Sequence, residues 1–75
     1  MQKIFVVDDE RQIADGLSVA LREAQFNVET FYDAGSALLR AKNYLPDILI
    51  SDVVMPGMDG VALAQILQKL NPICK

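Results

Sequence analysis

Two apolar runs constrain the fold of this chain more than any other feature of its sequence. They read KIFVV at residues 3–7 and ILISDV at residues 48–53. β-Branched and aromatic residues without polar alternation are typical of a short strand that is buried on both faces, as strands of parallel sheets are. We therefore predict two strands in the interior of a sheet.

A third strand is predicted at residues 27–31, where NVETF alternates apolar and polar residues. This alternation is typical of a strand with one exposed face or of a strand at the edge of a sheet. The three predicted strands are separated by longer segments, in which the apolar residues recur at a different spacing.

Apolar residues at helical spacing predict three helices between and after the strands. The first covers residues 10–25, the second begins after an N-cap at Asp33 and is broken at residues 43–46, and the third follows a loop at residues 55–60 and stops at Asn71–Pro72. The predicted apolar faces are Ile13, Leu17, Ala20, Leu21 and Ala24 in the first helix, Ala37, Leu38 and Ala41 in the second, and Leu63, Ile66, Leu67 and Leu70 in the third.

The resulting order, β-α-β-α-β-α, favours parallel strands joined by right-handed helical crossovers. The two fully apolar strands belong inside the sheet and the alternating strand at its edge. We therefore predict an α/β fold with strand order 2-1-3 and helices on both faces. A chain of 75 residues provides for one small domain.

Composition excludes several classes of protein. Ten acidic and seven basic residues give a net charge of −3, and the basic residues are scattered, so we expect no direct nucleic-acid binding by this chain. Cys74 is the single cysteine, which excludes an intrachain disulfide framework. No apolar run approaches the ~18 residues that a membrane span needs. We expect a soluble cytoplasmic domain that does not contact a membrane.

Acidic residues follow the two apolar strands. Asp8, Asp9 and Glu10 end the first, and Asp52 ends the other. The carboxyl ends of parallel strands meet at one edge of the sheet, so three aspartates should converge there and repel one another unless a cation lies among them. Carboxylates without histidine or cysteine suit Mg²⁺. Beside such a metal, Asp52 could attack phosphorus as a nucleophile, with Asp8 and Asp9 holding the metal.

These residues also carry a family resemblance. FVVDDE at residues 5–10, PD at 46–47 and LISDVVMPGMDG at 49–60 resemble the receiver domain of two-component response regulators, in order and with matching spacing. The resemblance implies a flavodoxin-like, three-layer α/β/α fold. It also implies that residues 1–75 are the N-terminal part of a single receiver domain, without the fourth and fifth strands.

The resemblance implies a role for each site residue. Asp52 would be the phosphoacceptor, receiving a phosphoryl group from a sensor histidine kinase. Mg²⁺ would be bound by Asp8, Asp9, Asp52 and the backbone carbonyl of Val54, with Asp9 as the more direct ligand and Asp8 acting largely through water. Residues 55–57 would shape the turn that places the Val54 carbonyl.

Parts of the family pattern are not found in these 75 residues. They are the Ser or Thr that ends the fourth strand, and the Lys and the switch aromatic of the fifth. We therefore expect a weakened phosphoacceptor site. The third strand would lie at an open edge with apolar side chains, so we also expect self-association through that edge, giving a homodimer.

Other interpretations remain open at the level of sequence. The chain could be a truncated, non-switching scaffold for dimerisation or interaction. It could also be a hydrolytic phosphatase, although such enzymes carry D-x-D where residues 8–10 read D-D-E. We expect an acceptor of a phosphoryl group and not an enzyme. Local roles compete as well: Glu10 is an acid favoured at a helix N-terminus, and Asp33, Asp47 and Asp59 are cap or turn residues.

Overall fold

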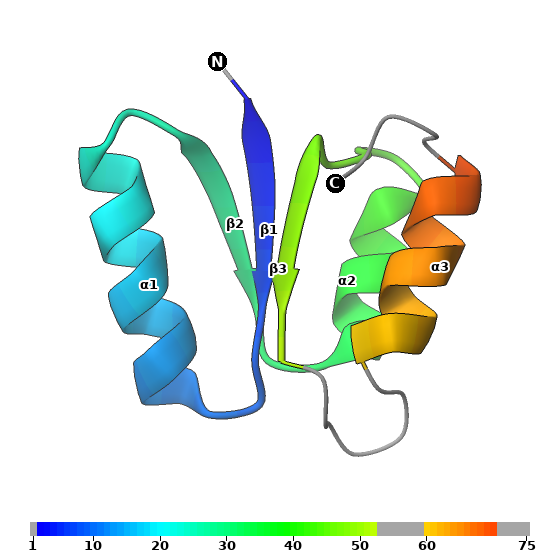
Figure 1. Cartoon of the computed structure of the whole chain (residues 1–75), viewed down its shortest axis with the longest axis horizontal. Helices are drawn as coiled ribbons and strands as arrows, with labels where there is room; N and C mark the ends of the chain where they lie inside the picture. Colours follow the sequence, from blue (N-terminus) through cyan, green and yellow to red (C-terminus); the bar gives the residue numbers. More distant parts are fainter. Residues whose placement is uncertain (1, 53–59, 71–75) are drawn as a thin grey trace.

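The computed structural model describes residues 2–52 and 60–70 and contains a single sheet with helices on both sides (Figure 1). The elements in chain order are β1 (Lys3–Val7), α1 (Arg11–Glu23), β2 (Asn27–Phe31), α2 (Ala34–Ala41), β3 (Ile48–Ser51) and α3 (Gly60–Leu70). Within these residues, no helix combines the length and the apolar character that crossing a bilayer requires.

The sheet has the predicted order, β2-β1-β3, and both pairs of strands are parallel. Ile4 lies opposite Val28 on β2 and opposite Ile48 on β3, and the register continues without interruption along β1. Helix α1 covers one face of the sheet, and α2 and α3 cover the other (Figure 1). The predicted three-layer α/β/α arrangement is therefore confirmed.

The alternating side chains of β1 divide the core into two clusters. Ile4 and Val6 face α1, and Phe5 and Val7 face α2 and α3; all of them are buried, because β1 has a strand on each side and helices above and below. The first cluster is completed by Ala14 and Val28, and the second by Ala34, Ala37, Ala41 and Leu63.

The predicted apolar face of the first helix was partly wrong. Ala14 and Ser18 are the buried residues of α1, whereas Ile13 is 52% exposed and Ala20 and Ala24 are exposed. The helix turns a polar residue inward because the Ser18 hydroxyl is satisfied there by the Thr30 hydroxyl of β2, at 2.6 Å between the oxygens. Small residues at the contact also let α1 lie close to the sheet.

The ends of α1 differ slightly from the prediction. The helix begins at Arg11 and ends at Glu23, where residues 10–25 were predicted. It stops because Gln25 adopts a positive φ of 75°, a left-handed conformation that no α-helix continues. Asp33, in contrast, is confirmed as the N-cap of α2: its carboxylate accepts a hydrogen bond from the Ser36 amide at 2.7 Å.

The third strand is shorter and less buried than predicted. It covers Ile48–Ser51, whereas residues 48–53 were predicted, and all four of its residues are half-buried. The reason is its place in the sheet, since among the described residues β3 pairs with β1 alone. The third predicted helix is α3, but the stop at Asn71–Pro72 lies outside the described residues.

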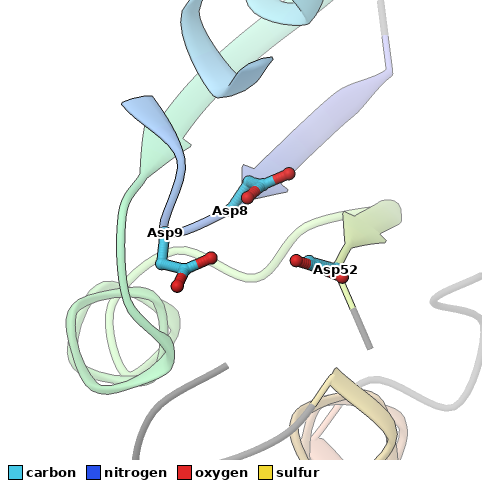
Figure 2. A group of neighbouring side chains, drawn as sticks. All are labelled: Asp8, Asp9 and Asp52. Atoms are coloured by element: carbon cyan, nitrogen blue, oxygen red, sulfur yellow. The ribbon is translucent and has the colours of Figure 1, made fainter. Parts of the chain in front are cut away.

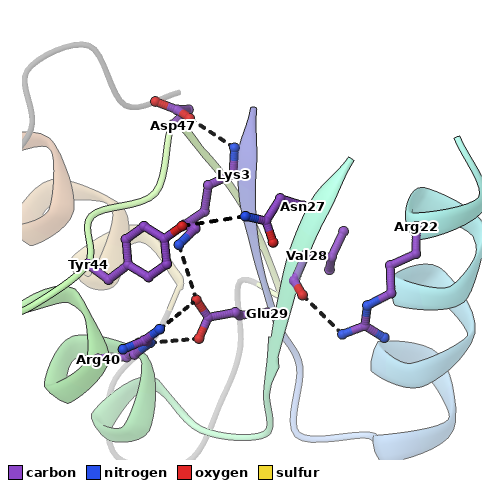
Figure 3. Close-up of polar contacts among 8 residues, drawn as sticks. All are labelled: Lys3, Arg22, Asn27, Val28, Glu29, Arg40, Tyr44 and Asp47. Carbon is purple, nitrogen blue, oxygen red and sulfur yellow. Dashed lines mark hydrogen bonds and ion pairs between the residues drawn. The ribbon is translucent and has the colours of Figure 1, made fainter. Parts of the chain in front are cut away.

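The amino-terminal end of the sheet is held by a group of charged side chains (Figure 3). Glu29 on β2 accepts a hydrogen bond from the Arg40 guanidinium of α2 at 2.7 Å and forms an ion pair with the Lys3 ammonium at 3.4 Å. Lys3 is only 4% exposed, and its ammonium lies against the ring of Tyr44. Asp47, predicted as a cap or turn residue, accepts from the Lys3 amide at 2.9 Å and so ties β3 to β1.

We predict that Glu29 stabilises the fold in a pH-dependent way. The hydrogen bond from Arg40, with help from Lys3, holds the pKa of this carboxyl below its ordinary value of 4.5 against the opposing effect of partial burial. Such a group contributes stability that is present above its unfolded-state pKa and is lost as the pH falls through the folded-state pKa. Urea unfolding of Glu29→Gln at neutral pH should show a free energy of unfolding about 1–2 kcal/mol below the parent's.

The difference between Glu29→Gln and the parent should shrink as the pH is lowered into the acid range. Glu23→Gln is the matched control, because Glu23 is an exposed glutamate at the end of α1, and it should leave the pH dependence unchanged. A constant difference from neutral to acid pH would contradict a role for the Glu29 charge.

Candidate functional site

Two strand ends position the acidic residues at one edge of the sheet. Asp8 follows β1, and its amide donates to the carbonyl of Phe31 on β2 at 3.1 Å. Asp52 follows β3, and its amide donates to the carbonyl of Val7 on β1 at 3.0 Å. Each aspartate therefore continues the hydrogen-bonding pattern of the sheet by one residue, which fixes its backbone next to the neighbouring strand.

The predicted convergence of the three aspartates is present in the structure. Asp8, Asp9 and Asp52 each offer a carboxylate oxygen, and these oxygens lie within 4.8 Å of one another. Figure 2 shows that the three side chains, which come from the ends of β1 and β3, lie next to one another. Asp8 is half-buried, and Asp9 and Asp52 are exposed, so the cluster opens to solvent. Residues that are far apart in the chain thus form one group.

Glu10 takes no part in this cluster. It occupies the N-cap position of α1 with an extended backbone, and its side chain makes no capping hydrogen bond. Its amide donates to Oδ1 of Asp8 at 2.9 Å. One oxygen of Asp8 therefore has a local structural task at the start of α1, in addition to the place of this residue in the cluster.

The donor set of the cluster fits a hard divalent cation. Three carboxylates at this spacing repel one another, and a cation among them removes that repulsion. All the donors are oxygens, and the sequence contains no histidine that would favour a transition metal. Mg²⁺ binds through one or two carboxylates and keeps several waters, which suits an open cluster at a sheet edge.

A cavity of about 280 Å³ adjoins two of the aspartates. Asp8 and Asp52 contribute to its lining together with apolar side chains of α1 and β3, among them Ile13, Leu17 and Ile50. The cavity lies on the face of the sheet that α1 covers only in part, which explains why Ile13 is exposed although it is apolar.

One predicted ligand is not placed. The Val54 carbonyl, the turn at residues 55–57 and Asp59 lie outside the described residues. The structure therefore brings together the three predicted carboxylates, while the fourth predicted ligand stays a prediction.

Two features near the cluster were missed by the sequence reasoning. The Tyr32 hydroxyl donates to Oδ1 of Asp15 at 2.6 Å, and this bond raises the pKa of Tyr32 above its ordinary value of 10.0. The Arg11 guanidinium lies 4.2 Å from the centre of the Tyr32 ring. These contacts tie the start of α1 to the chain after β2. No spacing rule predicts them, because they join residues of different elements.

The second missed feature is Ser51, the last residue of β3. Its hydroxyl donates to the backbone carbonyl of Asp52 at 2.9 Å. The signal in the sequence was a serine that ends the apolar run ILI directly before the aspartate.

Comparison with known proteins identifies the family. The family model named response regulator receiver domain matches residues 4–75 of the sequence. The chain belongs to this family. Its flavodoxin-like fold is likewise shared with solved receiver domains. The response regulator TrrA of Thermotoga maritima, in a crystal structure of its complex with Mg²⁺–BeF, is 32% identical with a TM-score of 0.89, over all of this chain and 65% of that one.

The chain is also similar to chemotaxis and regulatory proteins. The chemotaxis protein CheY4 of Vibrio cholerae is 34% identical with a TM-score of 0.88, over 97% of this chain and 61% of that one. The regulatory protein VanRc of Enterococcus gallinarum is 40% identical over 93% of this chain. The transcriptional regulatory protein TcrX of Mycobacterium tuberculosis is 38% identical over 92%. The receiver chain spans 30% of the length of each of the last two relatives.

Proposed function

We propose that this receiver chain accepts a phosphoryl group on Asp52 from a sensor histidine kinase of a two-component phosphorelay. The observation that carries the proposal is the convergence of Asp8, Asp9 and Asp52 within 4.8 Å at the carboxyl ends of β1 and β3. Membership of the receiver family supports it. The chain serves as an acceptor that is modified, not as an enzyme that turns over a substrate.

The proposed transfer is a substitution at phosphorus. A carboxylate oxygen of Asp52 attacks the phosphorus of a phosphohistidine, the P–N bond breaks, and its electron pair returns to the imidazole nitrogen. The new P–O bond makes a mixed anhydride on Asp52. Asp52 is exposed, and its amide is held by the Val7 carbonyl of β1, so a donor can reach a carboxylate whose backbone is fixed.

Asp8, Asp9 and Asp52 are the residues that would hold Mg²⁺, together with the Val54 carbonyl outside the described residues. When bound, the metal neutralises charge on the transferring phosphoryl group. Asp9 would serve as the direct ligand. Asp8 would act through water, a division supported by the hydrogen bond that already occupies its Oδ1. TrrA, which is similar in fold, has been crystallised in complex with Mg²⁺–BeF.

The proposed function also concerns whether this chain binds nucleic acid and where in the cell it acts. Relatives of this chain include the DNA-binding response regulator MtrA of Mycolicibacterium smegmatis. In the present chain the basic residues are scattered and the net charge is −3, so binding to nucleic acid falls outside its own role. We place the phosphorelay step in the cytoplasm.

Self-association through β3 is a second proposed property. It is also the property on which the alternative function, a scaffold for dimerisation, depends. Arg22 covers the other edge of the sheet, since its guanidinium donates to the Val28 carbonyl at 3.0 Å on the outer side of β2 (Figure 3). At β3, alternate amides point to opposite edges, and the Asp52 amide is the one directed at β1. The amides of Leu49 and Ser51 therefore point outward, where a second β3 can pair with them.

Phosphorylation of Asp52 is tested by intact mass after incubation with phosphoramidate and Mg²⁺. The parent should gain one phosphoryl increment, and Asp52→Asn should gain none, because an amide cannot act as the nucleophile. Asp47→Asn is the matched control: it makes the same exchange at the opposite end of β3 and should be phosphorylated like the parent. A folded parent without the increment, or an increment in Asp52→Asn, refutes the proposal.

Metal binding is tested by calorimetric titration with Mg²⁺. The parent should bind one ion, and Asp9→Asn should weaken the affinity by about tenfold or more, because it removes a charged ligand from the cluster. Asp47→Asn again provides the control and should bind like the parent. Equal affinities for Asp9→Asn and the parent would exclude Asp9 as a ligand.

Self-association is tested by light scattering at micromolar concentrations, where the parent should show a mass above that of the monomer. Amide hydrogen exchange at Leu49 and Ser51 should slow as the concentration rises, because pairing protects the outward amides. A monomeric mass rules out the dimer, and association without slower exchange at these two amides rules out the β3 edge as its contact.

A further inference from the structure

We infer that Ser51 is a positioning residue for phosphoryl transfer to Asp52, an inference that rests on the proposed function of Asp52. The Ser51 hydroxyl is 2.9 Å from the backbone carbonyl of Asp52, to which it donates. This contact comes from the last residue of β3 and acts on the first residue beyond it. It therefore lies at the carboxyl end of β3.

Two hydrogen bonds act at opposite ends of the Asp52 backbone. Its amide is fixed by the Val7 carbonyl of β1 at 3.0 Å, on the side towards the strand. Its carbonyl accepts from the Ser51 hydroxyl, at the carboxyl side of the residue. Together they restrain both backbone dihedrals of Asp52, and these dihedrals set the direction in which the carboxylate leaves the backbone.

The direction of this carboxylate matters because the cluster is small. Its three carboxylate oxygens lie within 4.8 Å, so a modest rotation of the Asp52 backbone changes which of them can share one cation. It also changes the line along which an oxygen of Asp52 approaches phosphorus. Displacing a reacting group by about 1 Å can slow a reaction about 100-fold.

Serine is suited to this task by its short side chain. A hydroxyl on Cβ reaches backbone groups of neighbouring residues, which an apolar side chain at the end of a strand cannot bond. The preceding residues of β3 are apolar and pack on the core clusters, whereas Ser51 ends the run with a hydroxyl whose hydrogen bond to Asp52 is exposed. Threonine keeps the hydroxyl, and alanine removes it without adding bulk.

The test compares Ser51→Ala and Ser51→Thr in the whole chain. With phosphoramidate at saturating Mg²⁺, the maximal rate of Asp52 phosphorylation should fall about tenfold in Ser51→Ala, while the donor concentration at half-maximal rate stays unchanged. Ser51→Thr should restore the rate. Ser36→Ala, which removes a hydroxyl bond to Asp33 elsewhere in the chain, is the matched control and should react like the parent.

A second readout is independent of phosphorylation. In chain labelled with carbon-13, the carboxyl resonance of Asp52 should shift in Ser51→Ala and keep its parent position in Ser51→Thr. Parental rate and resonance in Ser51→Ala overturn the inference. The inference is also overturned if Ser51→Thr shows the same slower rate and the same shifted resonance as Ser51→Ala. Both changes then come from general damage to the strand.

The two proposals can fail separately. If the parent gains no phosphoryl group, the phosphoacceptor function fails, while the carbon-13 resonances still decide whether Ser51 orients the carboxylate. If the parent reacts at Asp52 and Ser51→Ala reacts equally well with an unchanged resonance, the function stands and the inference about Ser51 falls.

Discussion

β1 is paired with a parallel strand on each side, and all five of its side chains are buried. Successive side chains of β1 point to opposite faces of the sheet, so the strand contributes to both apolar clusters, one beneath α1 and one beneath α2 and α3. The same strand places the acids, because Asp8 continues it and the Val7 carbonyl accepts from the Asp52 amide. Packing and site geometry are therefore set by one element, and a change that shifts β1 in the core also moves the carboxylates.

The two ends of the sheet carry charge in opposite ways. At the amino-terminal end, the negative charge of Glu29 is matched by the positive charges of Lys3 and Arg40. At the carboxyl end, the carboxylates of Asp8, Asp9 and Asp52 lie together, with one oxygen of each within 4.8 Å of the others. A fold can tolerate such repulsion where it is exposed to water, and a site for a cation and an anionic phosphoryl group needs it.

The backbone arrangement follows from short-range patterns in the sequence, which is why it could be predicted. The apolar runs determine the interior strands, and the parallel order brings Asp8, Asp9 and Asp52 to one edge. The face of α1 could not be predicted from apolar spacing, because the burial of Ser18 depends on a hydroxyl of β2. The half-burial of β3 depends on its neighbours, and the bond between Tyr32 and Asp15 joins residues that no local pattern connects.

Arg22 gives the sheet one covered edge. Its guanidinium takes up the outward carbonyl of Val28, so a strand that approaches β2 finds an acceptor already used and a positive charge in its way. In the proposed self-association, a second chain would therefore meet less competition at β3 than at β2. A pair formed around a two-fold axis at β3 would leave only the two β2 edges on the outside, and at each of them the Val28 carbonyl would already be bound by Arg22.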